Sequence, residues 1–156
     1  MAHHTIIYGH ICGAFGRAGD DYYKLHELNK SIINSLPEND DSEYPWINRS
    51  MFSIPNKQGV FRDQIITFGA SYKTLEYEWH IWLEKFEAIL KQLYWYDATI
   101  HASFEVFGDY TYEWLMKVDQ TYDNWFKEIP EPLINWEYQS DGPRTFLDRL
   151  HKKIYE

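Results

Sequence analysis

The chain has 156 residues, with 24 Asp and Glu against 15 Lys and Arg, a formal net charge of −9 and 44% hydrophobic residues. This length suffices for one domain with a substantial core, and we expect residues 1–156 to form a single domain. So acidic a surface repels phosphate backbones and anionic bilayers. It therefore argues against nucleic acids and membranes as partners and favours a basic protein.

Aromatic residues are unusually frequent: 7 Trp, 13 Tyr and 9 Phe make up 19% of the chain. Each such ring buries on the order of 150–250 Å², so a small domain can hardly hide all of them. Tyr and Trp are also enriched at protein interfaces. The excess leaves two interpretations open, an over-aromatic core or a core with an additional binding surface.

The N-terminal segment bears on location and on thiol chemistry. Cys12 is the single cysteine, which excludes an internal disulfide and a multi-thiolate metal site, and we interpret it as an inert small hydrophobe in a strand. His10 and His26 have no partners nearby in the sequence and are interpreted as satisfied core or surface residues. The opening "MAHHTIIYGHICG" lacks the pattern of a signal peptide, and no apolar run reaches the length of a membrane span. We expect a cytoplasmic protein.

The first third of the chain predicts a strand and a helix. Residues 5–15 are dense in β-branched and aromatic residues, which predicts a strand, and Gly9 on it allows another element to approach closely. Apolar residues at helical spacing predict a helix over 20–36, which Pro37 ends.

An acidic loop and two strands follow. Loop 37–45 is polar, the segment 46–54 predicts a short strand between two prolines, and residues 62–73 predict its partner strand.

Residues 74–93 predict an amphipathic helix. Thr74 is its expected N-cap, and two glutamates lie near the positive end of its dipole. One apolar stripe predicts that the helix packs on a sheet, and it consists of Trp79, Trp82, Leu83, Phe86, Ile89, Leu90 and Leu93. Trp95 and Tyr96 lie off this stripe and are the better candidates for the surface.

Residues 98–118 predict a β-hairpin. A three-residue loop over 107–109 aligns Phe104 with Tyr112 and sets apolar against apolar side chains along both strands. A short helix over 119–129, an irregular segment and a last helix from Pro143 are predicted beyond it.

The predicted class is α+β, with the order β-α-β-β-α-β-β and a helical tail. The first six elements match a ferredoxin-like split βαβ sandwich of two helices on one antiparallel sheet, here with an extra C-terminal hairpin strand. That topology hosts many unrelated functions and does not determine activity.

The sequence contains no strong catalytic motif. "GAFGRAG" lacks the lysine-serine ending of a phosphate-binding loop and the spacing of the dinucleotide fingerprint. A glycine-flanked nucleophilic serine is also missing. We therefore expect a non-catalytic protein that uses no cofactor.

The polar face of the predicted hairpin offers an alternative. His101 and Glu105 project the same way from one strand, and Glu113 lies across from Ser103 in the predicted register. A histidine and two carboxylates that converge can bind a divalent cation or a small molecule. A solvated sheet face explains the same residues.

Two segments interleave carboxylates with large aromatic side chains. The first is loop 37–45 with the aromatic residues that follow, and the second is 119–141, with six carboxylates against one lysine. A surface for a basic protein combines both features, because charge steers the encounter and rings supply a desolvated anchor. A solvated loop that keeps the protein soluble explains the same segments. The candidate partner-binding residues are Glu38, Asp40, Asp41, Glu43, Trp46, Asp123, Trp136 and Glu137.

The runs "PWINRSMFSIP", "IITFGASYK" and "EWHIWLEKFEAILKQLYW" resemble a group of small bacterial proteins, over about residues 44–115. Such small acidic α+β cytosolic proteins are similar to immunity proteins encoded beside secreted antibacterial toxins, which neutralise the toxin by binding it. The resemblance implies a non-catalytic binder of a basic toxin domain. It implies no individual site residue, and the oligomeric state stays open.

Overall fold

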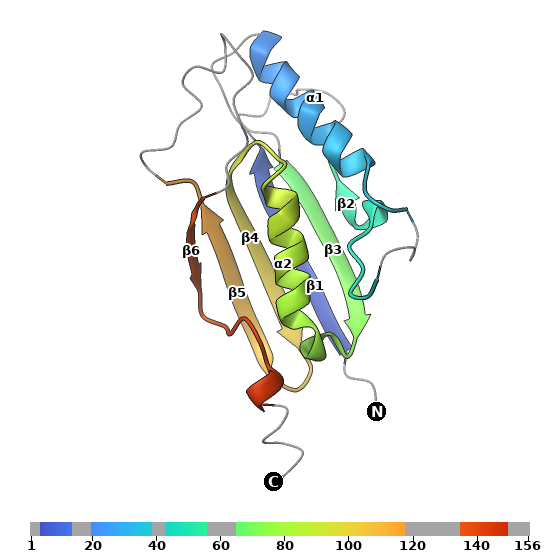
Figure 1. The fold of residues 1–156 in the computed structure, drawn as a ribbon, viewed down its shortest axis with the longest axis vertical. Coiled ribbons are helices and arrows are strands. Elements are labelled where there is room, and N and C mark those ends of the chain that lie inside the picture. Colours follow the sequence, from blue (N-terminus) through green and yellow to red (C-terminus); the bar gives the residue numbers. More distant parts are fainter. Residues whose placement is uncertain (1–3, 14–19, 39–42, 56–64, 118–134, 150–156) are drawn as a thin grey trace.

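The structure, a computed structural model, describes residues 4–13, 20–38, 43–55, 65–117 and 135–149. It is an α+β protein with a six-stranded antiparallel sheet and three helices, the third being a short turn at 147–149 (Figure 1). The other elements are, in chain order, β1 (His4–Gly13), α1 (Asp20–Asn34), the 3₁₀ helix η1 (Arg49–Met51), β2 (Phe52–Ser53), β3 (Ile65–Lys73), the 3₁₀ helix η2 (Leu75–Tyr77), α2 (Trp79–Leu90), β4 (Trp95–Phe104), β5 (Gly108–Leu115) and β6 (Glu137–Ser140).

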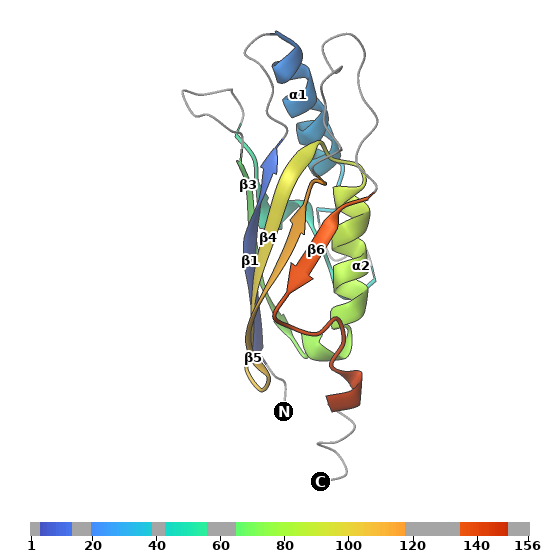
Figure 2. The same ribbon diagram turned by 90° about the vertical axis from the view of Figure 1, so that its left-hand side faces the viewer.

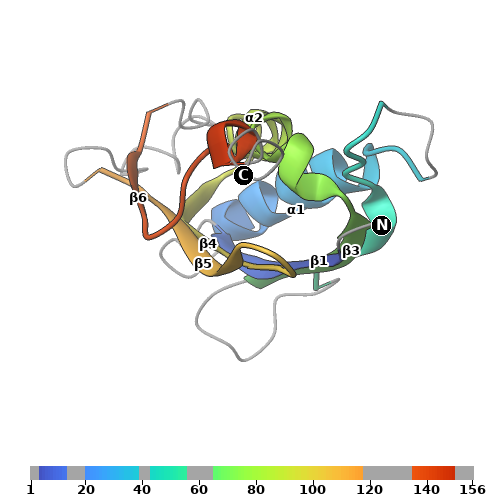
Figure 3. The same ribbon diagram turned by 90° about the horizontal axis from the view of Figure 1, so that it is seen from below.

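The sheet has the strand order β2-β3-β1-β4-β5-β6, and every neighbouring pair is antiparallel. Both long helices lie on the same face of the sheet (Figure 3). At the edge of the sheet farthest from β2, the strand β6 curls out of the sheet toward α2 (Figure 2). Within the described ranges, neither α1 nor α2 has the length and apolar character needed to cross a bilayer.

β1 runs through the middle of the sheet, and its two faces differ. Ile7 and Ile11 are fully buried under the helices, whereas Ile6 and Tyr8 on the opposite face are 44% and 53% exposed. This alternation confirms the predicted strand over the described residues. At Gly9 an added Cβ would lie 2.0 Å from the backbone oxygen of Thr99, so β4 approaches β1 more closely there than any side chain allows.

The apolar stripe of α2 is buried as predicted, but the helix begins at Trp79 and not at the predicted Thr74. Thr74 has a left-handed φ of 56° and makes no capping bond; its hydroxyl donates to the carbonyl oxygen of Lys73 at 2.7 Å. The predicted N-cap is therefore wrong. Leaving β3 requires a tight reversal, and the chain makes it with Thr74 and η2.

Among the described residues, four tryptophans are fully buried: Trp79, Trp82, Trp95 and Trp114. The prediction that Trp95 lies at the surface is wrong, because this residue starts β4 and its Nε1 donates to the Leu90 carbonyl at 2.8 Å. That carbonyl ends α2 and also accepts from the Leu93 backbone N–H at 3.2 Å.

The other three buried indoles also have acceptors. Trp82 donates to the Tyr72 hydroxyl at 3.1 Å, and Trp79 donates to the Tyr112 hydroxyl at 3.0 Å. Trp114 donates to Oε2 of Glu87 at 2.9 Å. These bonds join α2 to β3 and β5.

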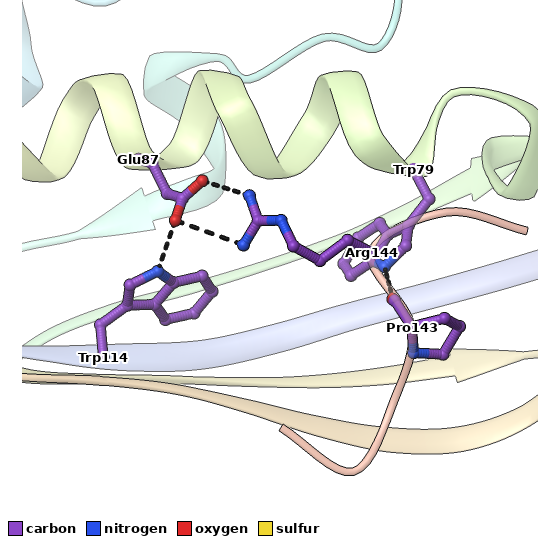
Figure 4. Close-up of polar contacts among 5 residues, drawn as sticks. All are labelled: Trp79, Glu87, Trp114, Pro143 and Arg144. Carbon is purple, nitrogen blue, oxygen red and sulfur yellow. Dashed lines mark hydrogen bonds and ion pairs between the residues drawn. The ribbon is translucent and has the colours of Figure 1, made fainter. Parts of the chain in front are cut away.

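The C-terminal segment crosses beside α2 (Figure 4). The Pro143 carbonyl accepts from Trp79 Nε1 at 3.2 Å, and Arg144 forms an ion pair with Glu87. Phe146 is fully buried, while Leu147 is 47% exposed. A helix starting at Pro143 was predicted; instead, residues 143–146 bind the core in non-helical conformation, and the helical turn comes after them.

Two short strands differ from the prediction. Only Phe52–Ser53 of the predicted strand 46–54 pairs with β3, because η1 occupies the residues before it. The segment predicted to be irregular contains the four-residue strand β6, which pairs with β5. Strands this short carry too few alternating residues to be recognised locally.

The hairpin β4–β5 forms with another register than predicted. Phe104 pairs with Gly108 and not with Tyr112, so the loop is residues 105–107. The shift of four residues is even, and each side chain therefore keeps its predicted face. Gly108 has a φ of 97°, which favours glycine and fixes the turn there.

α1 is attached to the sheet end through buried polar side chains. Asn29 donates to the Tyr94 carbonyl at 2.8 Å and accepts from the Tyr94 N–H at 2.7 Å. His26, 2% exposed, has Nε2 at 2.7 Å from the Pro55 carbonyl oxygen. His26 is therefore a satisfied core histidine, one of the two predicted possibilities.

We expect Gly9→Ala to destabilise the protein by about 3 kcal/mol, because overpacking against backbone displaces β4 from β1. Gly69→Ala is the matched control: its Cβ would meet its nearest neighbours at 3.7 and 3.8 Å, and we expect a change within about 0.5 kcal/mol. Urea unfolding measures both. Equal losses of unfolding free energy in Gly9→Ala and Gly69→Ala would contradict the close approach of β4 to β1 at Gly9.

Substitutions at Glu87 separate its two interactions. Glu87→Gln keeps an oxygen for Trp114 but removes the ion pair, and we expect a loss of up to about 1 kcal/mol, as for Arg144→Ala. Glu87→Ala also orphans the buried indole N–H, and we expect a further loss of about 1–3 kcal/mol. Urea unfolding of the three variants tests this order; a Gln variant as unstable as the Ala variant would exclude it.

Candidate functional site

A groove of about 630 Å³ lies between the segment before β2 and the outer side of β3. We call it the aromatic groove. It is lined by Tyr44, Trp46, Asn48, Ser50, Met51, Gly69, Ala70, Ser71, Tyr72, Lys73 and Thr74.

Hydrogen bonds fix the outer wall of the aromatic groove to β3. The Tyr44 hydroxyl donates to the Lys73 carbonyl at 2.6 Å, and the Tyr72 hydroxyl donates to the Trp46 carbonyl. The rings of Tyr44 and Trp46 meet edge to face, with centroids 4.9 Å apart. Lys85 of α2 donates to the Pro45 carbonyl at 3.0 Å from behind. The wall is therefore held by the core, which favours a preformed site.

The charged residue that lines the groove is Lys73, and carboxylates lie beside its Tyr44 end. Burial, followed by the nearby charge of Glu78, raises the pKa of Tyr44 to about 12, and Glu76 contributes in the same direction. Burial also raises the pKa of Glu78, although His80 opposes this shift. Glu43 precedes Tyr44 and is exposed. These carboxylates would stabilise a cationic group of a ligand at the Tyr44 end of the groove.

β3 offers part of its backbone to the aromatic groove. β2 pairs only with Thr67 and Phe68, and within the described chain no strand pairs with residues 69–73 on that side. A strand edge of this kind accepts an added strand from another protein. The groove thus combines a strand edge and aromatic walls, with carboxylates beside the end at Tyr44.

Some predicted partner-binding residues of the first acidic segment lie at this groove. Trp46 is half-buried in its wall, and Glu38 and Glu43 are exposed. Glu38 follows Pro37, whose carbonyl accepts from the Arg49 backbone N–H at 2.7 Å, so it lies near the groove segment. Asp40 and Asp41 lie outside the described residues.

The second predicted cluster lies at the opposite edge of the sheet. Trp136 is half-buried against Trp95, with ring centroids 6.0 Å apart, and the Lys91 ammonium lies 5.9 Å from its ring centroid. Glu137 is exposed in β6, and Asp123 lies outside the described residues. Since β2 and β6 are the two edge strands, the described residues Trp46 and Trp136 lie toward opposite edges of the sheet.

The alternative hairpin site lies on the helix-free face of the sheet. His101 stacks on Tyr8 at 5.1 Å, and Glu105 accepts a hydrogen bond from the His4 backbone N–H at 2.6 Å. Glu113 pairs with Thr99, so its predicted place across from Ser103 is wrong. His101, Glu105 and Glu113 do not form a ligand cluster in the described part of the chain.

Sequence reasoning missed a group on the same face. His10, Cys12 and Asp97 place one potential ligand atom each within 4.8 Å of the others. His10 Nε2 lies 3.6 Å from Asp97 Oδ1, so His10 has a partner that its sequence neighbours did not reveal. The alternate positions of His10 and Cys12 on one strand were the only local signal.

Comparisons with protein-family models, with curated proteins and with solved structures find no match.

The raised pKa of Tyr44 predicts a dependence of stability on alkaline pH. In the unfolded chain this phenol titrates near its ordinary value of 10.0, while the folded protein holds the proton up to about pH 12. Its contribution is complete below pH 10 and is lost as the pH rises toward 12. We expect unfolding free energies of Tyr44→Phe to fall less steeply over this range than those of the parent. Parallel curves would show that Tyr44 is not perturbed.

Proposed function

We propose that the protein is a non-catalytic binding module that holds an extended, basic segment of a partner protein in the aromatic groove. One observation carries this proposal: a strand edge and an aromatic wall occur together in one groove, with Glu43 and Glu78 beside its Tyr44 end. The negative charge of the whole chain supports a cationic partner, because it speeds encounter over long range.

The proposed mechanism uses β-strand addition. The partner segment pairs with the backbone of β3 over residues 69–72, and main-chain hydrogen bonds supply part of the affinity. An apolar side chain of that segment packs on Tyr44 and Trp46, where ring contact is worth most once water is excluded. A neighbouring Lys or Arg of the partner meets Glu43 and Glu78.

The partner we propose is a basic toxin domain, neutralised in the cytoplasm by an immunity protein. The resemblance to immunity proteins suggests this class, and the net charge of −9 suits a basic partner. Occlusion of a toxin requires a stable complex but no catalytic group on this chain.

For the fold, we propose a ferredoxin-like split βαβ sandwich with β5, β6 and the C-terminal segment added. The order β2-β3-β1-β4, the antiparallel neighbours and the position of both helices on one face support this assignment (Figure 3). In this frame the groove lies at the β2 edge and the added elements at the other.

A random peptide library displayed on phage tests the groove. We expect peptides selected on the parent to be rich in Lys and Arg with an apolar anchor. Trp46→Ala should weaken their binding by about 2 kcal/mol, roughly 30-fold in Kd, because it removes the ring wall. Glu43→Lys should act mainly by slowing association, which surface plasmon resonance resolves.

The matched controls lie at the opposite edge of the sheet. Trp136→Ala and Glu137→Lys make the same chemical changes away from the groove and should leave binding of these peptides unaltered. Selected peptides without basic residues, or peptides that bind Trp46→Ala as tightly as the parent, would refute the proposal.

A further inference from the structure

The helix-free face of the sheet carries a second group of side chains that could bind a ligand. None of them lines the aromatic groove, and the inference drawn from them does not depend on the proposed partner. His10 and Cys12 occupy alternate positions of β1 and therefore project to the same face. Asp97 of β4 pairs directly with Cys12. Imidazole, thiol and carboxylate thus converge from two central strands.

The distances suit a small metal ion. His10 Nε2 and Asp97 Oδ1 are 3.6 Å apart, and all three ligand atoms lie within 4.8 Å of one another. Tetrahedral zinc with bonds of about 2.0–2.3 Å requires ligand atoms roughly 3.3–3.5 Å apart. The histidine–aspartate pair is already close to this separation, and the sulfur lies within 4.8 Å of both.

The backbone positions of the three residues are rigid. The register of β1 against β4 shifts just after the pair Cys12–Asp97, where Gly13 pairs with Trp95. Trp95 is fully buried and bonded to the end of α2, which holds the start of β4 in place. A bulge of this kind often re-aims side chains at functional sites.

We propose that His10, Cys12 and Asp97 bind one zinc-like divalent cation. A thiolate and an imidazole favour zinc over magnesium or calcium, which prefer oxygen ligands. The side chains of His10 and Asp97 are 39% and 29% exposed, so the fourth coordination position is open to water or to a donor from a ligand. Three protein ligands with one open position are typical of reactive rather than purely structural zinc.

Cobalt(II) is the probe that tests this site in the full chain. Because Cys12 is the single cysteine, a thiolate-to-cobalt absorption band in the near ultraviolet can arise only from that residue. We expect metal-free protein to develop this band at one equivalent of cobalt and to lose it when zinc is added. Absence of the band at saturating cobalt would overturn the proposal.

Variants then assign the remaining ligands by calorimetric titration with zinc. His10→Ala and Asp97→Asn, both at partly exposed positions, should weaken binding by more than about 100-fold, since loss of outer-shell partners alone costs 10–100-fold. His101→Ala, on the same face, is the control and should bind zinc like the parent. Unchanged affinity in His10→Ala or Asp97→Asn would mean that these residues form an ion pair only.

Discussion

Four buried tryptophans each need an acceptor for the indole N–H, and the arrangement of the fold meets this constraint. An unpaired buried N–H costs about 1–3 kcal/mol, comparable to a large share of the stability of a small domain. The acceptors are the hydroxyls of Tyr72 and Tyr112, the Glu87 carboxylate and the carbonyl that ends α2. They come from β3, β5 and the last turn of α2. Many of the aromatic side chains therefore belong to the core. Their ring contacts and hydrogen bonds connect the helices, the sheet and the C-terminal segment.

Regular patterns in the sequence predicted the parts of the fold that depend on periodicity alone. The stripe of α2 identified Trp79 and Trp82 as buried because helical spacing places them on one face. Trp95 was misplaced because it was judged as a continuation of that helix, whereas it opens a strand with a period of two. The hairpin register shows the same limit: apolar alternation is satisfied after any even shift, and only the backbone conformation at Gly108 distinguishes the alternatives.

The candidate sites were predictable only where their residues are close in sequence. The mixture of acid and ring around Trp46 indicated a surface, but the groove also needs the outer side of β3, which was interpreted only as a partner strand. Residues His10 and Asp97 meet through the β1–β4 pairing, and no local spacing encodes that contact. Long-range strand pairing thus brought together residues that had been assigned separately to core, surface and loop.

The unequal burial of the tryptophans also gives the protein an optical signature. Of the six that the structure describes, four are enclosed, and Trp46 and Trp136 are half-buried at opposite sheet edges. A soluble quencher such as acrylamide would reach the emission of these two first. Shielding of either by a bound ligand would lower the fraction of the emission that the quencher reaches, without any attached label. The rings of Trp79 and Trp82 stack with their centroids 5.3 Å apart and add a near-ultraviolet circular dichroism signal. This signal is lost only when the core unfolds.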